Sequence, residues 1–82
     1  MKEYELSNHA LEMLSERGIS EEWLRSVIES ADIEEVDEDG NVHYLKAIPE
    51  YDSRVLRVIV NPNTDPVRVI TLFFDRRLRR LG

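Results

Sequence analysis

His9 and Arg17 are the first pair of residues whose types suggest chemistry. On a helix, His9, Met13 and Arg17 stand one turn apart, each rotated by about 40° from the last. Such a slanting stripe could present an imidazole as general acid or base and a guanidinium that binds phosphate through two hydrogen bonds. Alternatively, His9 contacts solvent or the sheet, and Arg17 neutralises the carbonyl end of its helix.

Arg57 is the second candidate, because it interrupts an apolar segment from Val55 to Val60. An arginine in such a strand must reach solvent or a carboxylate, since burying it unpaired is costly. If the strand from Val42 to Ile48 pairs beside it, Lys46 and Arg57 could share a partly polar face with Tyr44. The alternative is an exposed strand arginine paired with an acidic side chain.

A basic cluster follows Phe73 and Phe74 near the end of the sequence, comprising Arg76, Arg77, Arg79 and Arg80. Adjacent aromatic and basic groups are typical of some RNA-contacting surfaces, which makes Arg76 and Arg77 candidate substrate-binding residues. A solvated tail, or a segment that docks on an acidic surface, would have the same composition.

Metal and cofactor sites are not expected. The acidic run from Asp32 to Asp39 lacks the glycine and glutamate that a calcium loop beginning at Asp37 would need at Val42 and Ile48. His9 and His43 have no further ligands at metal spacing, the chain has no cysteine, and it has no glycine-rich phosphate loop. The acidic run is better explained as a charged hairpin edge.

The elements that position these residues follow from local signals. Ser7 and Ser20 are placed to cap two helices, and Gly18 ends the first.

Tyr4 to Leu6 could form a short lead-in strand. Four strands are then expected at Ile33–Asp37, Val42–Ile48, Val55–Val60 and Val67–Phe74, separated by the Asp39-Gly40 hairpin turn and other turn clusters. The tail from Asp75 to Gly82 could be a short basic helix or frayed. The pattern predicts one α+β domain over 1–82, with two N-terminal helices packed on a three- to four-stranded antiparallel sheet.

Charge is unevenly divided along the 82 residues, whose net charge is -6. Residues 1–52 hold fifteen acidic and four basic side chains, whereas residues 53–82 hold two acidic and seven basic ones. The overall sign argues against broad, nonspecific binding to nucleic acid. The asymmetry leaves a basic face for RNA, or equally suits self-association or a charged protein partner. No segment approaches the roughly 20 apolar residues that span a bilayer, and a cytoplasmic protein is expected.

Five segments stand out together: Ser7-x-His9-Ala10, Arg17-Gly18-Ile19-Ser20, the acidic hairpin with Gly40, Leu56-Arg57-Val58-Ile59-Val60 and Val69-Ile70-Thr71. Together they resemble an uncharacterised bacterial and archaeal domain family whose members look like the RelE-type and BrnT-type toxins of toxin–antitoxin systems. The resemblance covers nearly the whole chain, and its most specific elements are His-Ala and Arg-Gly-Ile.

The resemblance implies helices packed on an antiparallel sheet and a metal-independent endoribonuclease that a cognate antitoxin neutralises. In that chemistry the RNA 2′-hydroxyl attacks the adjacent phosphate. His9, Arg17 and Arg57 match the family positions and would be the catalytic residues; Tyr44, Lys46, Arg76 and Arg77 would contact the substrate. The family usually has arginine at Met13. That difference and the acidic charge favour a second hypothesis, a non-catalytic module that dimerises or binds a partner protein.

Overall fold

The computed structural model describes residues 3–78. Over this range the chain forms two α-helices, a short 3-10 helix and five strands, in the order β1 (Tyr4–Leu6), α1 (Asn8–Arg17), α2 (Glu21–Ser30), β2 (Ile33–Val36), β3 (Val42–Ile48), η1 (Pro49–Tyr51), β4 (Arg54–Asn61) and β5 (Val67–Phe74). The fold is therefore α+β, as predicted.

Local capping sets the ends of the helices. The Ser7 hydroxyl accepts a hydrogen bond from the Ala10 amide at 3.0 Å, and the Ser20 hydroxyl accepts one from the Trp23 amide at 3.1 Å. Gly18 ends α1 with a φ of 62°, in the left-handed region that glycine occupies without steric cost. The prediction of two capped helices joined by a tight turn is confirmed.

The sheet differs from the prediction of three or four antiparallel strands. Over residues 3–78 it has five strands in the order β1-β5-β4-β3-β2, and β1 runs parallel to β5 while the other pairs are antiparallel. The lead-in segment Tyr4–Leu6 fills the free edge of β5, with Tyr4 opposite Val67 and Leu6 opposite Val69. No local turn joins these two strands, so no short-range signal announces the pairing.

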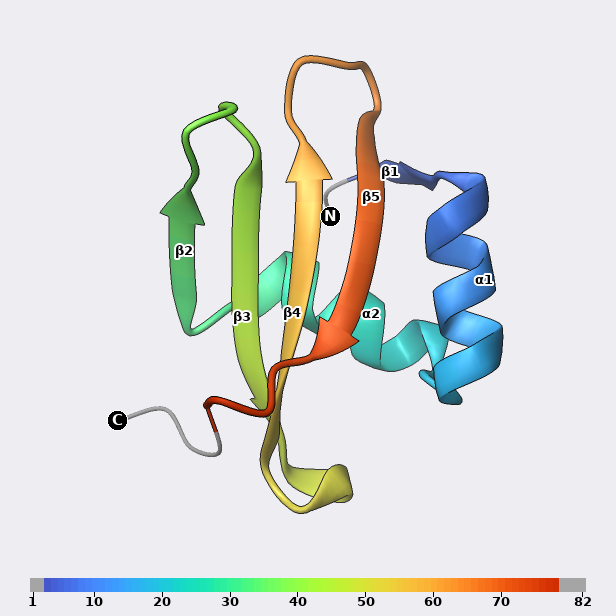
Figure 1. The fold of residues 1–82 in the computed structure, drawn as a ribbon, viewed down its shortest axis with the longest axis vertical. Helices are drawn as coiled ribbons and strands as arrows, with labels where there is room; N and C mark the ends of the chain where they lie inside the picture. The colour runs from blue at the N-terminus through green and yellow to red at the C-terminus, as the bar shows by residue number, and fades with distance from the viewer. Residues whose placement is uncertain (1–2, 79–82) are drawn as a thin grey trace.

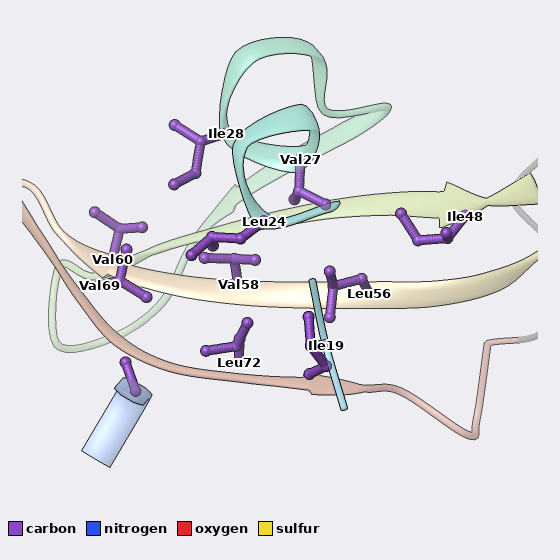
Figure 2. Close-up of a cluster of buried hydrophobic side chains, with 11 residues drawn as sticks. Ile19, Leu24, Val27, Ile28, Ile48, Leu56, Val58, Val60, Val69 and Leu72 are labelled. Atoms are coloured by element: carbon purple, nitrogen blue, oxygen red, sulfur yellow. The ribbon is translucent and has the colours of Figure 1, made fainter. Parts of the chain in front are cut away.

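Both helices lie on one side of the sheet. In Figure 1, α2 passes behind the central strands and α1 lies beside the β1–β5 edge, whereas none of the helices formed by residues 3–78 lies in front of the strands. Figure 2 shows Leu24 and Val27 of α2 directed toward strand residues that include Val58 and Leu56. All four of these side chains are fully buried. Each contributes about 1.5–3 kcal/mol of apolar transfer free energy, so the core holds the helix layer to one face.

Alternation along β3 and β4 leaves a second face without helical cover. Leu56, Val58 and Val60 belong to the core under the helices, so Val55, Arg57 and Ile59 project from the other face. We call this the helix-free face. Within residues 3–78, neither ten-residue helix has the length and apolar character needed to cross a bilayer.

Candidate functional site

A chain of polar side chains crosses the helix-free face. His43 Nε2 lies 2.8 Å from Asp37 Oδ2, and His43 Nδ1 lies 2.8 Å from Arg57 NH1. The Arg57 Nε and NH2 groups each lie 3.0 Å from Asp75 Oδ2. Glu35 Oε2 lies 4.0 Å from Arg57 NH1. The side chains of His43 and Arg57 are 17% and 12% exposed, so the network is half-buried but open to solvent.

Strand register brings His43 and Arg57 together. His43 of β3 pairs with Ile59 of β4, and Leu45 pairs with Arg57. His43 and Arg57 are therefore diagonal neighbours on one face, at a separation that long side chains bridge. The register of β3 and β4 thus places His43 and Arg57 side by side on the helix-free face.

Asp37 is held in place by the β2–β3 hairpin turn. Its Oδ1 accepts hydrogen bonds from the backbone amides of Asp39 at 2.9 Å and Asn41 at 3.0 Å. Its Oδ2 remains for His43. The hydrogen bond from His43, supported by those from the two backbone amides, holds the pKa of Asp37 below its ordinary value. Asp37 is therefore an oriented carboxylate beside the imidazole.

Asp75 closes the other end of the network and is only 4% exposed. Its backbone amide donates to the carbonyl of Val55 at 2.8 Å, which fixes the residue just beyond the end of β5. Its carboxylate accepts hydrogen bonds from Arg57 and from the backbone and side chain of Arg77. These bonds, with Arg77 making the largest contribution, lower the pKa of Asp75 to about 2 despite its burial.

The hydrogen bonds also determine the tautomer of His43. A guanidinium can only donate, so Arg57 NH1 donates to Nδ1, which must carry a lone pair. The proton then resides on Nε2, which donates to the Asp37 carboxylate. In this arrangement the Nδ1 lone pair of His43 faces the Arg57 guanidinium. If an anion draws Arg57 away, Nδ1 becomes available to accept a proton.

The structure does not bring the three predicted catalytic residues together. His9 and Arg17 are exposed residues of α1, in the helix layer. Within residues 3–78 neither side chain has a hydrogen-bond or ion-pair partner. Arg57 projects from the opposite face of the sheet and pairs with Asp75. The alternative of an exposed strand arginine paired with an acidic side chain is therefore right about the partner, but the Arg57 side chain is only 12% exposed. Their assignment as one constellation therefore has no geometric support.

The hypothesis that Tyr44 and Lys46 share a face with Arg57 is wrong. Arg57 pairs with Leu45 and therefore shares its face of the sheet. Tyr44 and Lys46, on either side of Leu45 in β3, point to the opposite face. Tyr44 packs against the core beneath the helices. Lys46 Nζ donates to the backbone oxygen of Ser30 at 3.3 Å and to its hydroxyl at 2.8 Å, and so neutralises the carbonyl end of α2.

Arg76 and Arg77, the predicted substrate-binding residues of the basic cluster, differ in their surroundings. Arg77 is bound to Asp75 although its side chain is 81% exposed. Arg76 is exposed and lines an open pocket beside Phe74. Arg79 and Arg80 lie outside the described residues. Arg76 and Arg77 are therefore next to the polar network, whereas Tyr44 and Lys46 are not.

Sequence reasoning missed Asp37, His43 and Asp75 as members of the site. Alternation along β3 already placed His43 with Leu45, on the face opposite Tyr44. The missing information was the register with β4, which decides whether Arg57 joins Leu45 or Lys46. Within residues 3–78, no group of three or more histidine, aspartate or glutamate side chains is arranged to hold a metal ion.

Comparison with known proteins identifies a family without assigning an activity. No curated protein and no solved structure matches the chain. The family model described as a domain of unknown function, DUF4258, matches residues 6–74. This range contains both helices, strands β2 to β5, and the network residues Asp37, His43 and Arg57. The chain therefore belongs to the DUF4258 family.

Proposed function

We propose that this protein is a toxin-like, metal-independent endoribonuclease related to the RelE and BrnT toxins. The observation that carries the proposal is the 2.8 Å contact between His43 Nδ1 and Arg57 NH1 on the helix-free face. An imidazole and a guanidinium at that distance supply a proton acceptor and a phosphate ligand to one substrate group. The motif resemblance of the chain supports the same reaction class.

The proposed reaction begins when an RNA phosphate competes for Arg57. The phosphate forms charge-assisted hydrogen bonds with the guanidinium and draws it from His43. Nδ1 then accepts the proton of the adjacent 2′-hydroxyl, and the 2′-oxygen forms a bond to phosphorus. The bond from phosphorus to the 5′-oxygen breaks, and that oxygen takes a proton from water. The products are a 2′,3′-cyclic phosphate and a 5′-hydroxyl end.

Each neighbour of the pair has a role in this scheme. Asp37 keeps the Nε2–H of His43 oriented and stabilises the imidazolium that forms, as the carboxylate of a catalytic triad does. Arg57 stabilises the extra negative charge of the phosphorane. Asp75 binds the Nε and NH2 groups of Arg57, whereas His43 contacts NH1. Asp75 would therefore keep the guanidinium on the helix-free face while NH1 turns toward the phosphate. Arg76 and Arg77 would contact phosphates flanking the scissile bond.

The proposal carries further expectations for the protein in a cell. A toxin of this kind acts in the cytoplasm on messenger RNA and is held inactive by a cognate antitoxin. A homodimer is compatible with the same arrangement. His9 and Arg17 would lie outside the reaction centre, and their catalytic role stays a separate prediction that the same assay tests.

A second candidate is a non-catalytic module that dimerises or binds a partner protein. The observation that favours it is the exposure of apolar side chains on the edge strand β2, where Val36 is 71% and Ile33 36% exposed. Met13, which stands where the family usually has arginine, packs against the core rather than extending a charged stripe. An inactive relative that retained the fold would show both features.

Incubation of purified protein with single-stranded RNA in EDTA tests the proposal. We expect cleavage that leaves cyclic phosphate ends and that falls at least a hundredfold in His43→Gln. Thermal denaturation of the variant verifies that it is folded. Intact RNA with the wild-type protein would reject the endoribonuclease and leave the interaction module.

A further inference from the structure

An open pocket of about 280 Å³ lies at the end of the sheet where β5 stops and the β3–β4 connection turns. Its lining residues come from both segments: Asp52, Arg54, Phe74, Asp75, Arg76 and Leu78. In Figure 1 both segments lie at the lower end of the sheet, η1 in yellow-green and the chain after β5 in red. The pocket shares Asp75 with the polar network of the helix-free face. A ligand here would therefore lie next to Arg57.

The apolar wall of the pocket is held rigidly. The ring of Phe74 lies 4.8 Å from that of Tyr51, and 6.0 Å from that of Trp23 in an edge-on arrangement. Trp23 and Tyr51 are themselves 5.5 Å apart. Three rings in mutual contact restrict one another's rotation, so Phe74 offers a fixed aromatic surface.

The pocket is lined by carboxylates as well as arginines, unlike a site that binds only anions. Arg54 and Arg76 are both exposed, and the Arg54 guanidinium lies 5.0 Å from the centre of the Tyr51 ring, which restrains it. Asp52 is an exposed carboxylate in the pocket lining and can accept a hydrogen bond. The charge of Asp75 is already matched by Arg57 and Arg77. The pocket thus combines one aromatic wall, two cations and one acceptor.

We propose that this pocket binds one nucleotide of an RNA chain. The base would contact the Phe74 side chain, its amino or imino hydrogens would reach Asp52, and its phosphate would pair with Arg54 and Arg76. Aromatic stacking accepts any base, and arginine pairs with phosphate, which is the combination by which proteins bind single-stranded RNA. This inference rests on the proposed function, for which it supplies the subsite adjoining Arg57.

The single tryptophan of the chain makes the binding measurable. Trp23 touches both Tyr51 and Phe74, so a base at Phe74 should change its fluorescence. We would titrate the full chain with 5′-AMP and with ribose 5-phosphate, which has the phosphate but no base. We expect 5′-AMP to bind at least tenfold more tightly, the effect of a single stacked base.

Arg54→Ala tests the cationic side of the pocket, and Arg68→Ala is its matched control. Arg68 is an exposed arginine paired with Glu5 on the β1–β5 edge, away from the pocket. We expect the affinity for 5′-AMP to fall at least fivefold in Arg54→Ala and to stay unchanged in Arg68→Ala. Phe74 is partly buried and packs against the core, so its replacement would also affect folding and Arg54 provides the cleaner test of this site.

Three results would overturn the pocket assignment: no binding of 5′-AMP, equal affinity for ribose 5-phosphate, or equal effects of the two arginine variants. The outcome is separable from that of the cleavage assay. 5′-AMP has no 3′-phosphate for a 2′-hydroxyl to attack, so its titration measures binding without any cleavage. Nucleotide binding without any RNA cleavage would sustain the pocket and reject the endoribonuclease.

Discussion

Replacing Asp75 with asparagine should destabilise the protein by about 2 kcal/mol at neutral pH. The carboxylate is 4% exposed and binds Arg57, whose side chain is itself only 12% exposed. Asp75→Asn keeps the shape of the side chain but removes its charge. Arg57 then keeps its contact with His43 while losing its closest counter-ion, and an uncompensated, largely buried cation is costly.

The magnitude follows from the pKa of Asp75, which the hydrogen bonds from Arg77 and, to a smaller extent, Arg57 lower from 3.8 to about 2 in the folded protein. Each pKa unit corresponds to about 1.4 kcal/mol, so the ionised carboxylate contributes about 2 kcal/mol to the free energy of unfolding. Because the folded pKa is depressed, this contribution is fully present above about pH 4. It is lost as the pH falls toward about 2, where protonation of the folded state begins to match that of the unfolded state.

Urea denaturation of wild type and Asp75→Asn at pH 7, 5, 3 and 2 measures both effects. The difference in free energy of unfolding should be constant from pH 7 to 5 and shrink to a small fraction of that value by pH 2. Asp39→Asn, in the exposed hairpin turn, is the matched control and should change stability by less than about 0.5 kcal/mol. Equal stability of Asp75→Asn and wild type at pH 7, or a difference independent of pH, would refute the reasoning.

Two further predictions concern the helix ends, and both are checked by urea denaturation. Ser7→Ala should lower the free energy of unfolding by about 1 kcal/mol more than Ser20→Ala. The Ser7 hydroxyl both caps α1 and donates to the Ile70 carbonyl at 2.8 Å, whereas Ser20 makes its cap in an exposed position. Equal losses of stability in the two variants would show that the bond from Ser7 to β5 contributes nothing. Gly18→Ala should cost about 1 kcal/mol, because its φ of 62° strains any residue with a Cβ although no atom lies within 4 Å of the added carbon; a neutral substitution would contradict this.

The helices could be predicted from the sequence because their signals are local. Ser7 and Ser20 lie next to the turns they cap, and Gly18 lies where the left-handed residue is needed. Similarly, Asp39-Gly40 marks the β2–β3 turn without reference to the rest of the chain. The capping and turn bonds of these residues reach groups within four positions, so the sequence alone contains the information that sets the helix ends and this turn.

The position of β1 could not be predicted in the same way. Tyr4 and Val67 are separated by most of the chain, and their pairing depends on the free edge that β5 offers once the sheet has formed. The strand is three residues long, too short for a clear alternation pattern. Parallel pairing requires a long connection between the two strands, and the chain from α1 to β4 supplies it.

The candidate site depends on register, which composition does not encode here. The segment from Val55 to Val60 is apolar on both faces apart from Arg57, so either face could have been buried. A shift of one residue would have placed Arg57 beside Lys46 instead of Leu45. The observed register sets Arg57 beside His43 and against Asp75, and this moves the predicted reaction centre from α1 to the helix-free face.

The most direct test of the account compares His43→Gln with His9→Gln in the RNA cleavage assay. The two variants remove one imidazole each, from opposite sides of the sheet, and leave the other intact. The account predicts that His43→Gln loses cleavage at least a hundredfold while His9→Gln cleaves at the wild-type rate. Loss of cleavage in His9→Gln with full activity in His43→Gln would contradict it and return the reaction centre to α1.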